Sequence, residues 1–230
     1  MNEAVEREWV THNIAREVKL KRNRRDQHER EIPTKEELRT IMSNAPEEHR
    51  PLLVTAIFTG MRISELRGLT WENVDFDRRL ILVRQRADEF GEMGPPKSRA
   101  GRRDIPMTPT VLETLIDWQK RCPKSELGLV FPNRSGNPFN YSNFYNRVFR
   151  PLLVANDIVD ENGEPRFSIH ALRHAAASLF IEQGWTAKKV QVLLGHSSIN
   201  MTMDVYGHLF ANPEEDVEMF EKLEQDLLAA

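Results

Sequence analysis

Six residues spread along the 230-residue chain have side chains that could together attack a phosphodiester. They are two arginines, a lysine, two histidines and a tyrosine: Arg62, Lys97, His170, Arg173, His196 and Tyr206. Guanidinium groups are fixed cations whose planar forks match phosphate oxygens. Imidazoles transfer protons near neutral pH, and a phenol can act as a nucleophile. The set therefore contains the groups needed to cleave a phosphodiester without a metal ion.

These residues lie in five short motifs that follow one another in a fixed order. The motifs are TGMRISEL at 59–66, PKS at 96–98, HALRH at 170–174, LGHSS at 194–198 and DVYGH at 204–208. In this order they resemble the tyrosine recombinases, most closely the phage-type integrases, and the resemblance covers residues 31–210. The combination is far more specific than any single motif, because each one alone is a short pattern with many chance matches.

The resemblance implies a role for each of the six residues. Arg62 and Arg173 would clamp the scissile phosphate and stabilise the charge of its transition state. Tyr206 would be the nucleophile, with His170 as its base. His196 would donate a hydrogen bond to a phosphate oxygen, and Lys97 would protonate the leaving 5′ oxygen. The family reaction is site-specific recombination of double-stranded DNA through a 3′-phosphotyrosyl link, carried out by four protomers on two sites without a cofactor.

Simpler interpretations exist for several of these residues. Arg62 could be an exposed helix arginine, with Glu65 either its surface ion-pair partner or a buried carboxylate that orients it. Lys97 could be a solvated lysine on a loop, assigned only because Lys-Ser ahead of a strand ending in Ile-Pro resembles the family turn. Tyr141 and Tyr145 are expected to be packing residues, four apart on an amphipathic helix.

The resemblance gives no role to the other basic and imidazole side chains near these motifs. Nearby arginines offer ordinary phosphate contacts, and the remaining histidines are expected to be structural or on the surface: Arg99, Arg102 and Arg103, and His12, His28, His49, His174 and His208. The histidines have no HExxH spacing and no cysteine partners, because Cys122 is the one cysteine, so a metal site is disfavoured.

The sequence pattern around these residues predicts the helices and strands that position them. It indicates an α+β fold that is mainly α-helical, with a small three-stranded antiparallel sheet. Thr34 to Glu37 form a capping box at the start of a helix, and buried helices follow over 51–59 and 63–68, so that Arg62 lies at a helix junction. Alternating apolar residues predict strands near 74–76, 80–83 and 105, the last two joined by a long mobile loop over 86–103 that carries Lys97. Further helices are expected at 111–120, 141–155, 169–183, 187–194 and 213–228.

Three segments are expected from this pattern. Residues 31–210 would form the catalytic domain, and residues 1–30 a remnant of the N-terminal DNA-binding domain and linker that such integrases carry. Residues 211–230 would form a tail helix that docks on a neighbouring protomer or, nearly as well, on its own domain. Residues 209–230 hold seven acids and one base, so the tail carries a charge of −6 and residues 1–208 carry +3 of the net −3.

That charge distribution is compatible with DNA binding if the bases cluster on one face. The apolar runs are too short for a membrane span and the start is no signal peptide, so the expected location is the cytoplasm. Two alternatives remain: a type IB topoisomerase-like enzyme that acts on one duplex, and a DNA-binding fragment that no longer cleaves.

Overall fold

The structure, a computed structural model, describes residues 2–13, 31–210 and 213–228. The chain divides into two compact units, Met1–Arg30 and Glu31–Ala230. The described part of the first unit contains a short helix, α1 (Asn2–Glu6). Residues 14–30, part of the predicted remnant and linker, lie outside the described residues.

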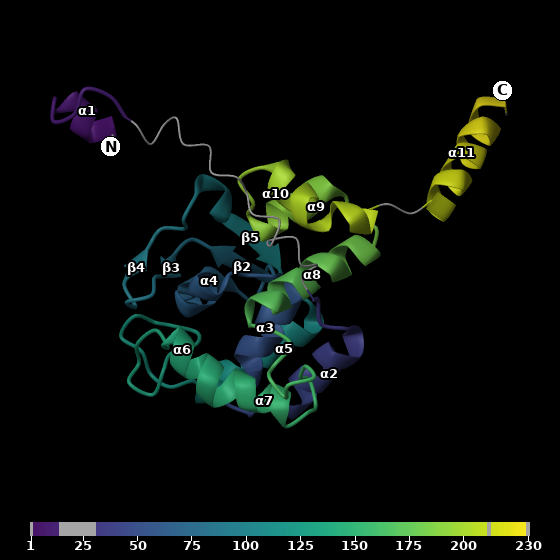
Figure 1. Ribbon diagram of the computed structural model, residues 1–230. Helices are drawn as coiled ribbons and strands as arrows, with labels where there is room; N and C mark the ends of the chain where they lie inside the picture. The colour runs from purple at the N-terminus through teal and green to yellow at the C-terminus, as the bar shows by residue number, and fades with distance from the viewer. Residues whose placement is uncertain (1, 14–30, 211–212, 229–230) are drawn as a thin grey trace. The chain divides into compact units, whose positions relative to one another are not determined.

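The second unit begins with three helices, α2 (Lys35–Asn44), α3 (Arg50–Thr59) and α4 (Ile63–Arg67). The predicted capping box is confirmed: the Glu37 amide donates to the Thr34 hydroxyl at 3.2 Å, and the Thr34 amide donates to the Glu37 carboxylate at 2.8 Å. Helix α3 is apolar on every side, as expected of a helix at the centre of a domain. It packs against α5 and α8 and ends just before Arg62 (Figure 1).

The predicted three-stranded sheet is confirmed. Its strands are β1 (Val74–Asp75), β2 (Leu80–Val83) and β5 (Arg103–Pro106), which pair antiparallel in the order β1-β2-β5. Ile81 lies opposite Val74 on one side and opposite Ile105 on the other, and all three are buried. A short 3-10 helix, η3 (Trp71–Asn73), leads into β1.

The segment between β2 and β5 differs from the expected loop. Its first half is a hairpin of β3 (Arg86–Ala87) and β4 (Met93–Gly94), followed by a 3-10 helix, η4 (Arg99–Gly101). The Asp88 carboxylate accepts hydrogen bonds from the amides of Phe90 and Glu92 and so closes the turn locally. The prediction of an irregular connection was therefore wrong for residues 86–94, because short-range turn chemistry was not recognised.

The C-terminal half is helical and follows the predicted pattern with two differences. Its elements are α5 (Pro109–Arg121), α6 (Tyr141–Phe144), the π-helical turn η5 (Tyr145–Phe149), α7 (Arg150–Val154), α8 (His170–Glu182), α9 (Ala187–Leu194), α10 (Ile199–Tyr206), η6 (Gly207–Phe210) and α11 (Pro213–Leu228). The expected helix at 141–155 contains the π turn. Helix α10 was not predicted, and Tyr206 is its last residue.

Two hydrophobic clusters hold these elements together. The larger is formed by α2, α3, the sheet, α5, α7 and the first half of α8. The smaller lies between α8, α9 and α10, and Tyr206 is one of its buried members. The predicted mainly helical α+β fold with its small antiparallel sheet is confirmed, and the second cluster places the candidate nucleophile inside the protein.

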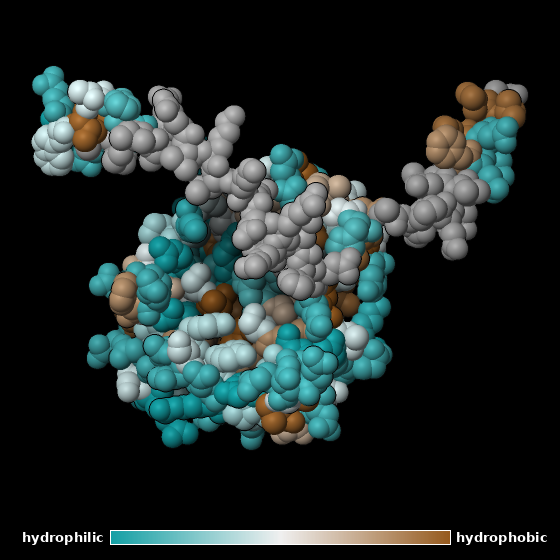
Figure 2. All heavy atoms as spheres, viewed as in Figure 1, coloured by the Kyte–Doolittle hydropathy of each residue, from teal (hydrophilic) through white to brown (hydrophobic). Residues whose placement is uncertain are grey.

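The described surface is mixed in character. Figure 2 shows hydrophobic residues scattered among hydrophilic ones, and hydrophobic residues at the visible end of α11. On this helix Phe220, Leu223, Leu227 and Leu228 are all exposed. Among the described residues, no helix combines the length and the apolar character needed to cross a membrane.

Candidate active site

The C-terminal end of α9 is the point at which three arginines meet. The last carbonyls of a helix have no partner within it and carry partial negative charge. Here three consecutive ones accept from guanidinium groups: Leu193 from Arg103 at 2.5 Å, Leu194 from Arg173 at 2.6 Å and Gly195 from Arg62 at 2.9 Å. Three residues that are distant in sequence are thereby brought to one place, immediately before His196.

Glu65 fixes two of these arginines. Its carboxylate, 2% exposed, accepts from Arg103 at 3.0 and 2.8 Å and from Arg62 at 2.9 Å, and it also binds the Arg62 amide. Burial alone would raise the pKa of Glu65, but the hydrogen bond and charge of Arg103, followed by those of Arg62, leave it lowered. Glu65 is therefore the buried orienting carboxylate rather than a surface partner. Arg103, expected to be a plain phosphate contact, is a buried structural cation.

Arg173 projects from the first turn of α8 and joins two helix ends. Besides Leu194 it donates to the carbonyl of Gly60, at the end of α3, at 2.6 Å. Burial, and then the charge of Arg62, lower the pKa of Arg173 to about 9, so the group is still a cation at neutral pH. Tyr206 belongs to the same hydrophobic cluster as Leu194, the last residue of α9, whose carbonyl binds Arg173.

His196 follows the glycine that ends α9. Its Nδ1 lies 2.9 Å from the hydroxyl of Thr202, which is fully buried on α10. Burial, and then the charges of Arg173 and Arg62, lower the pKa of His196 to about 4. The ring is therefore neutral at pH 7. If Nδ1 accepts the Thr202 proton, the ring proton lies on Nε2 and can be donated to a phosphate oxygen.

Tyr206 is buried, at 1% exposure, and its hydroxyl lies 2.6 Å from Nδ1 of His174, which is 8% exposed. His174 was expected to be structural or on the surface, so sequence reasoning missed this contact. The available signal was helical spacing: His174 follows His170 by one turn on the same face of α8. The His170 ring meets that of His174 edge-on, with their centroids 5.2 Å apart, and His170 itself is exposed.

Lys97 lies between β4 and η4 and is exposed. The residues after it pack close to the arginine cluster, because a Cβ added at Gly195 would stand 2.9 Å from the carbonyl oxygen of Ala100. Gly195 also has a φ of +66°, which favours glycine at this helix end. The segment that carries Lys97 thus borders the site, while its side chain extends into solvent.

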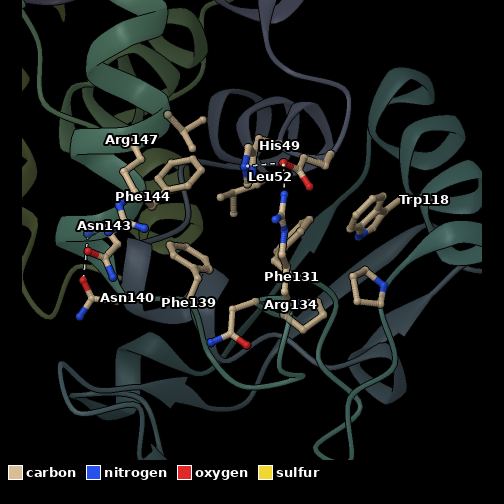
Figure 3. Close-up of a pocket in the computed structure, with 15 residues that line it drawn as sticks. His49, Leu52, Trp118, Phe131, Arg134, Phe139, Asn140, Asn143, Phe144 and Arg147 are labelled. Carbon is tan, nitrogen blue, oxygen red and sulfur yellow. Dashed lines mark hydrogen bonds and ion pairs between the residues drawn. The ribbon is translucent and has the colours of Figure 1, made fainter.

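A separate pocket of about 490 Å³ opens near the N-terminal end of α3 (Figure 3). Its lining includes aromatic and basic side chains, among them His49, Trp118, Phe139, Phe144 and Arg147. None of the six candidate residues lines this pocket, so it is not part of the candidate active site. Within residues 2–13, 31–210 and 213–228, no group of three or more acidic, histidine or cysteine side chains is arranged to hold a metal ion.

Removing the Glu65 carboxylate should strongly destabilise the fold. In Glu65→Ala the buried Arg103 loses its partner, and an uncompensated buried charge costs about 3–5 kcal/mol in the free energy of unfolding. Glu36→Ala, which breaks the exposed Glu36–Arg39 pair, is the control and should change little. Urea unfolding of both variants measures the effect, and equal losses would contradict it. Because the pKa of Glu65 is lowered in the folded protein, the excess loss should fade as the pH falls below the ordinary glutamate value of 4.5.

His196 should make the fold sensitive to moderate acid. Between the ordinary histidine pKa of 6.5 and the folded value of about 4, the unfolded chain binds a proton that the folded chain does not. The free energy of unfolding therefore falls as the pH drops through this range. In His196→Gln that fall should be smaller between pH 7 and 4.5. His12→Gln, at an exposed position, controls for loss of a histidine as such; identical pH profiles for wild type and His196→Gln would refute the shift.

Comparison with known proteins identifies the family of this chain. The model of the phage integrase family matches residues 32–212. The transposase of transposon Tn916 from Enterococcus faecalis is 29% identical over 65% of this chain and 40% of its own length. A XerC-like tyrosine recombinase from Caldanaerobacter subterraneus subsp. tengcongensis is 29% identical over 76% of this chain and 49% of its own length.

Among solved structures, the Tn1549 transposon integrase in complex with circular intermediate DNA superposes with a TM-score of 0.72. It is 26% identical, and the match covers 86% of this chain and 68% of that one. The chain thus spans between two fifths and one half of the length of the curated relatives named above. Since the family model covers most of the chain, from α2 to the end of η6, the protein belongs to the phage integrase family.

Proposed function

We propose that this chain is a site-specific DNA recombinase that cleaves and rejoins strands through Tyr206. Attack of the phenol on a phosphodiester gives a 3′-phosphotyrosyl link and a free 5′ hydroxyl, and the hydroxyl of a partner strand then displaces the tyrosine. The observation that carries the proposal is the convergence of Arg62, Arg173 and His196 at the end of α9, which packs against α10, where Tyr206 is buried.

The two arginines have the chemistry needed to hold the phosphate. Arg62 is about one quarter exposed and Arg173 is buried. Backbone carbonyls position both arginines, and Glu65 also positions Arg62. Fixed cations of this kind stabilise the extra negative charge of a pentavalent transition state without reorganising. Neutral His196 supplies a further donor, exposed His170 lies beside the cluster, and Lys97 is proposed to protonate the leaving 5′ oxygen.

Double-stranded DNA is the proposed substrate, and no cofactor takes part. The Tn1549 integrase, of similar fold, was solved with DNA. We further propose that four protomers act on two DNA sites in the cytoplasm, as the family resemblance suggests. The exposed apolar residues of α11, together with its acidic composition, suit a tail that docks on a neighbouring protomer.

Cleavage should persist in excess EDTA. Two arginines supply the electrostatic stabilisation that a metal ion would otherwise give, and the phosphoester bond is kept in the covalent intermediate. The amount of covalent adduct formed with and without EDTA measures this. A strict requirement for added Mg²⁺ in the cleavage step would contradict the mechanism.

The topoisomerase-like alternative shares the chemistry but acts on one duplex. The relatives named above, a transposase and a XerC-like recombinase, favour recombination. If the protein relaxes a supercoiled plasmid that lacks specific recombination sites, the topoisomerase-like function would be favoured over recombination.

The test of the proposed function is covalent trapping. The substrates are duplexes taken from the DNA that flanks the gene, with a nick close to the scissile bond. After cleavage the short fragment that carries the free 5′ hydroxyl diffuses away, so that it cannot reverse the reaction and the protein stays attached. An adduct at a defined phosphodiester supports the proposal. Site-specific binding without an adduct would favour the alternative of a DNA-binding fragment.

A further inference from the structure

The contact between Tyr206 and His174 joins two helices inside the protein. The phenol comes from the last residue of α10 and the imidazole from the second turn of α8. A separation of 2.6 Å between oxygen and Nδ1 is that of a well-formed hydrogen bond. It also lies within the range at which an activated nucleophile meets its base.

We propose that His174 is the base that accepts the phenol proton of Tyr206 during strand cleavage. The proposal rests on the proposed function and reassigns the part that the family resemblance gives to His170. His174 counts as a catalytic residue because it contacts the reacting oxygen itself.

Burial supports this assignment. Tyr206 is 1% exposed and His174 is 8% exposed. Because the phenol is buried, bulk water does not reach it to accept its proton. Binding of DNA must first expose Tyr206 and His174 to the phosphate. A proton that leaves the oxygen then has an imidazole nitrogen already in place. His170, by contrast, is exposed one turn earlier on α8, where it can meet the phosphate itself.

The charges that face His174 come from several elements. On α8 they are His170 and Arg173, on α10 Tyr206, and after α9 His196, whose pKa His174 helps to lower. Arg62, Arg103 and Glu65 belong to the same cluster. The cations of this cluster stabilise the negative charge that develops on the phenol oxygen as its proton leaves.

The step balances as follows in bonds and protons. The O–H bond of Tyr206 breaks and an N–H bond forms at Nδ1 of His174, which requires that the neutral ring carries its proton on Nε2 beforehand. The phenol oxygen bonds to phosphorus, and the bond from phosphorus to the 5′ oxygen breaks. That oxygen takes a proton from Lys97. In the rejoining step the attacking 5′ hydroxyl gives its proton to Lys97 and bonds to phosphorus. The bond from phosphorus to the phenol oxygen breaks, and His174 returns its proton to the tyrosine.

The test compares His174→Gln with His174→Ala in single-turnover cleavage of nicked duplex by the full chain. The glutamine carbonyl can still accept a hydrogen bond from the phenol but cannot take its proton. Both variants should therefore be slower by about 10²-fold or more at pH 7, the usual scale for losing a general base. The deficit should shrink as the pH rises, because an ionised phenol needs no base. Added imidazole should partly restore His174→Ala and leave His170→Ala unchanged.

A near-normal rate for His174→Gln would show that His174 only positions the phenol, and a deficit independent of pH and of imidazole would show that its role is structural. Either result overturns the proposal while leaving the recombinase function intact. If the wild-type chain forms no adduct, the proposed function fails and the role of His174 fails with it.

A measurement without DNA checks the contact itself. The ¹⁵N resonance of His174 Nδ1 should shift in Tyr206→Phe, which lacks the hydroxyl, and not in Tyr141→Phe. An unchanged resonance in Tyr206→Phe would refute the contact whatever the outcome of the cleavage assay. Thermal melting of each variant establishes that it is folded.

Discussion

Tyr206→Phe is expected to abolish the covalent adduct while the protein stays folded. The substitution removes one oxygen, which is the atom that must bond to phosphorus. It also removes the hydrogen bond to His174, and leaving a buried partner unsatisfied costs about 1–3 kcal/mol. A domain with this hydrophobic core should tolerate that loss, so thermal melting separates loss of chemistry from loss of fold. Denaturing gels of protein trapped on a nicked duplex measure the adduct.

The other two tyrosines provide matched controls. Tyr141 and Tyr145 stack with centroids 6.4 Å apart and pack against the larger core cluster, as predicted from their spacing. Tyr141→Phe and Tyr145→Phe should therefore keep the adduct. If the adduct survives in Tyr206→Phe, or disappears in either control while that variant is folded, Tyr206 is not the nucleophile.

Local signals in the sequence were enough to predict most of the elements. The Thr34–Glu37 capping box and the alternation around Ile81 act through neighbours in sequence or one strand away, and both were confirmed. Helix α10 was missed because its eight residues are short for a periodic signal. The β3–β4 hairpin was missed because the turn closed by Asp88 lacks the Asn-Gly or Asp-Gly pair that marks a tight hairpin.

In the candidate site, too, the sequence predicted local features but not long-range contacts. Residue type and order sufficed to select Arg62, Arg173, His196 and Tyr206, and the structure brings them into one cluster. The contacts that organise them are long-range: Arg103 reaches Glu65 across 38 positions, and His174 meets Tyr206 across 32. Such pairings depend on how α8, α9 and α10 pack, which neither hydrophobic periodicity nor motif spacing specifies. The sequence therefore selected residues that the structure brings together, and it did not identify the residues that position them.

Lys97→Ala is expected to slow cleavage of an ordinary DNA strand by about 10²-fold or more, the scale for losing a general acid. Lys97 is exposed on the segment between β4 and η4, and that segment approaches the arginine cluster where Ala100 meets Gly195. An exposed cation on this path can reach the leaving oxygen or merely bind phosphate. A duplex with a 5′-phosphorothiolate at the scissile bond distinguishes these roles, because sulfur leaves without protonation.

On the phosphorothiolate, Lys97→Ala should recover most of its lost rate relative to wild type, since the missing proton is no longer needed. Arg99, two residues further on and also exposed, is the matched control. Arg99→Ala should weaken binding, and any effect on the rate should be the same for oxygen and sulfur, because a phosphate contact does not depend on the leaving atom. Single-turnover rates at saturating protein isolate the chemical step from binding. Equal defects of Lys97→Ala on both substrates would make Lys97 a phosphate anchor and require another group to protonate the 5′ oxygen.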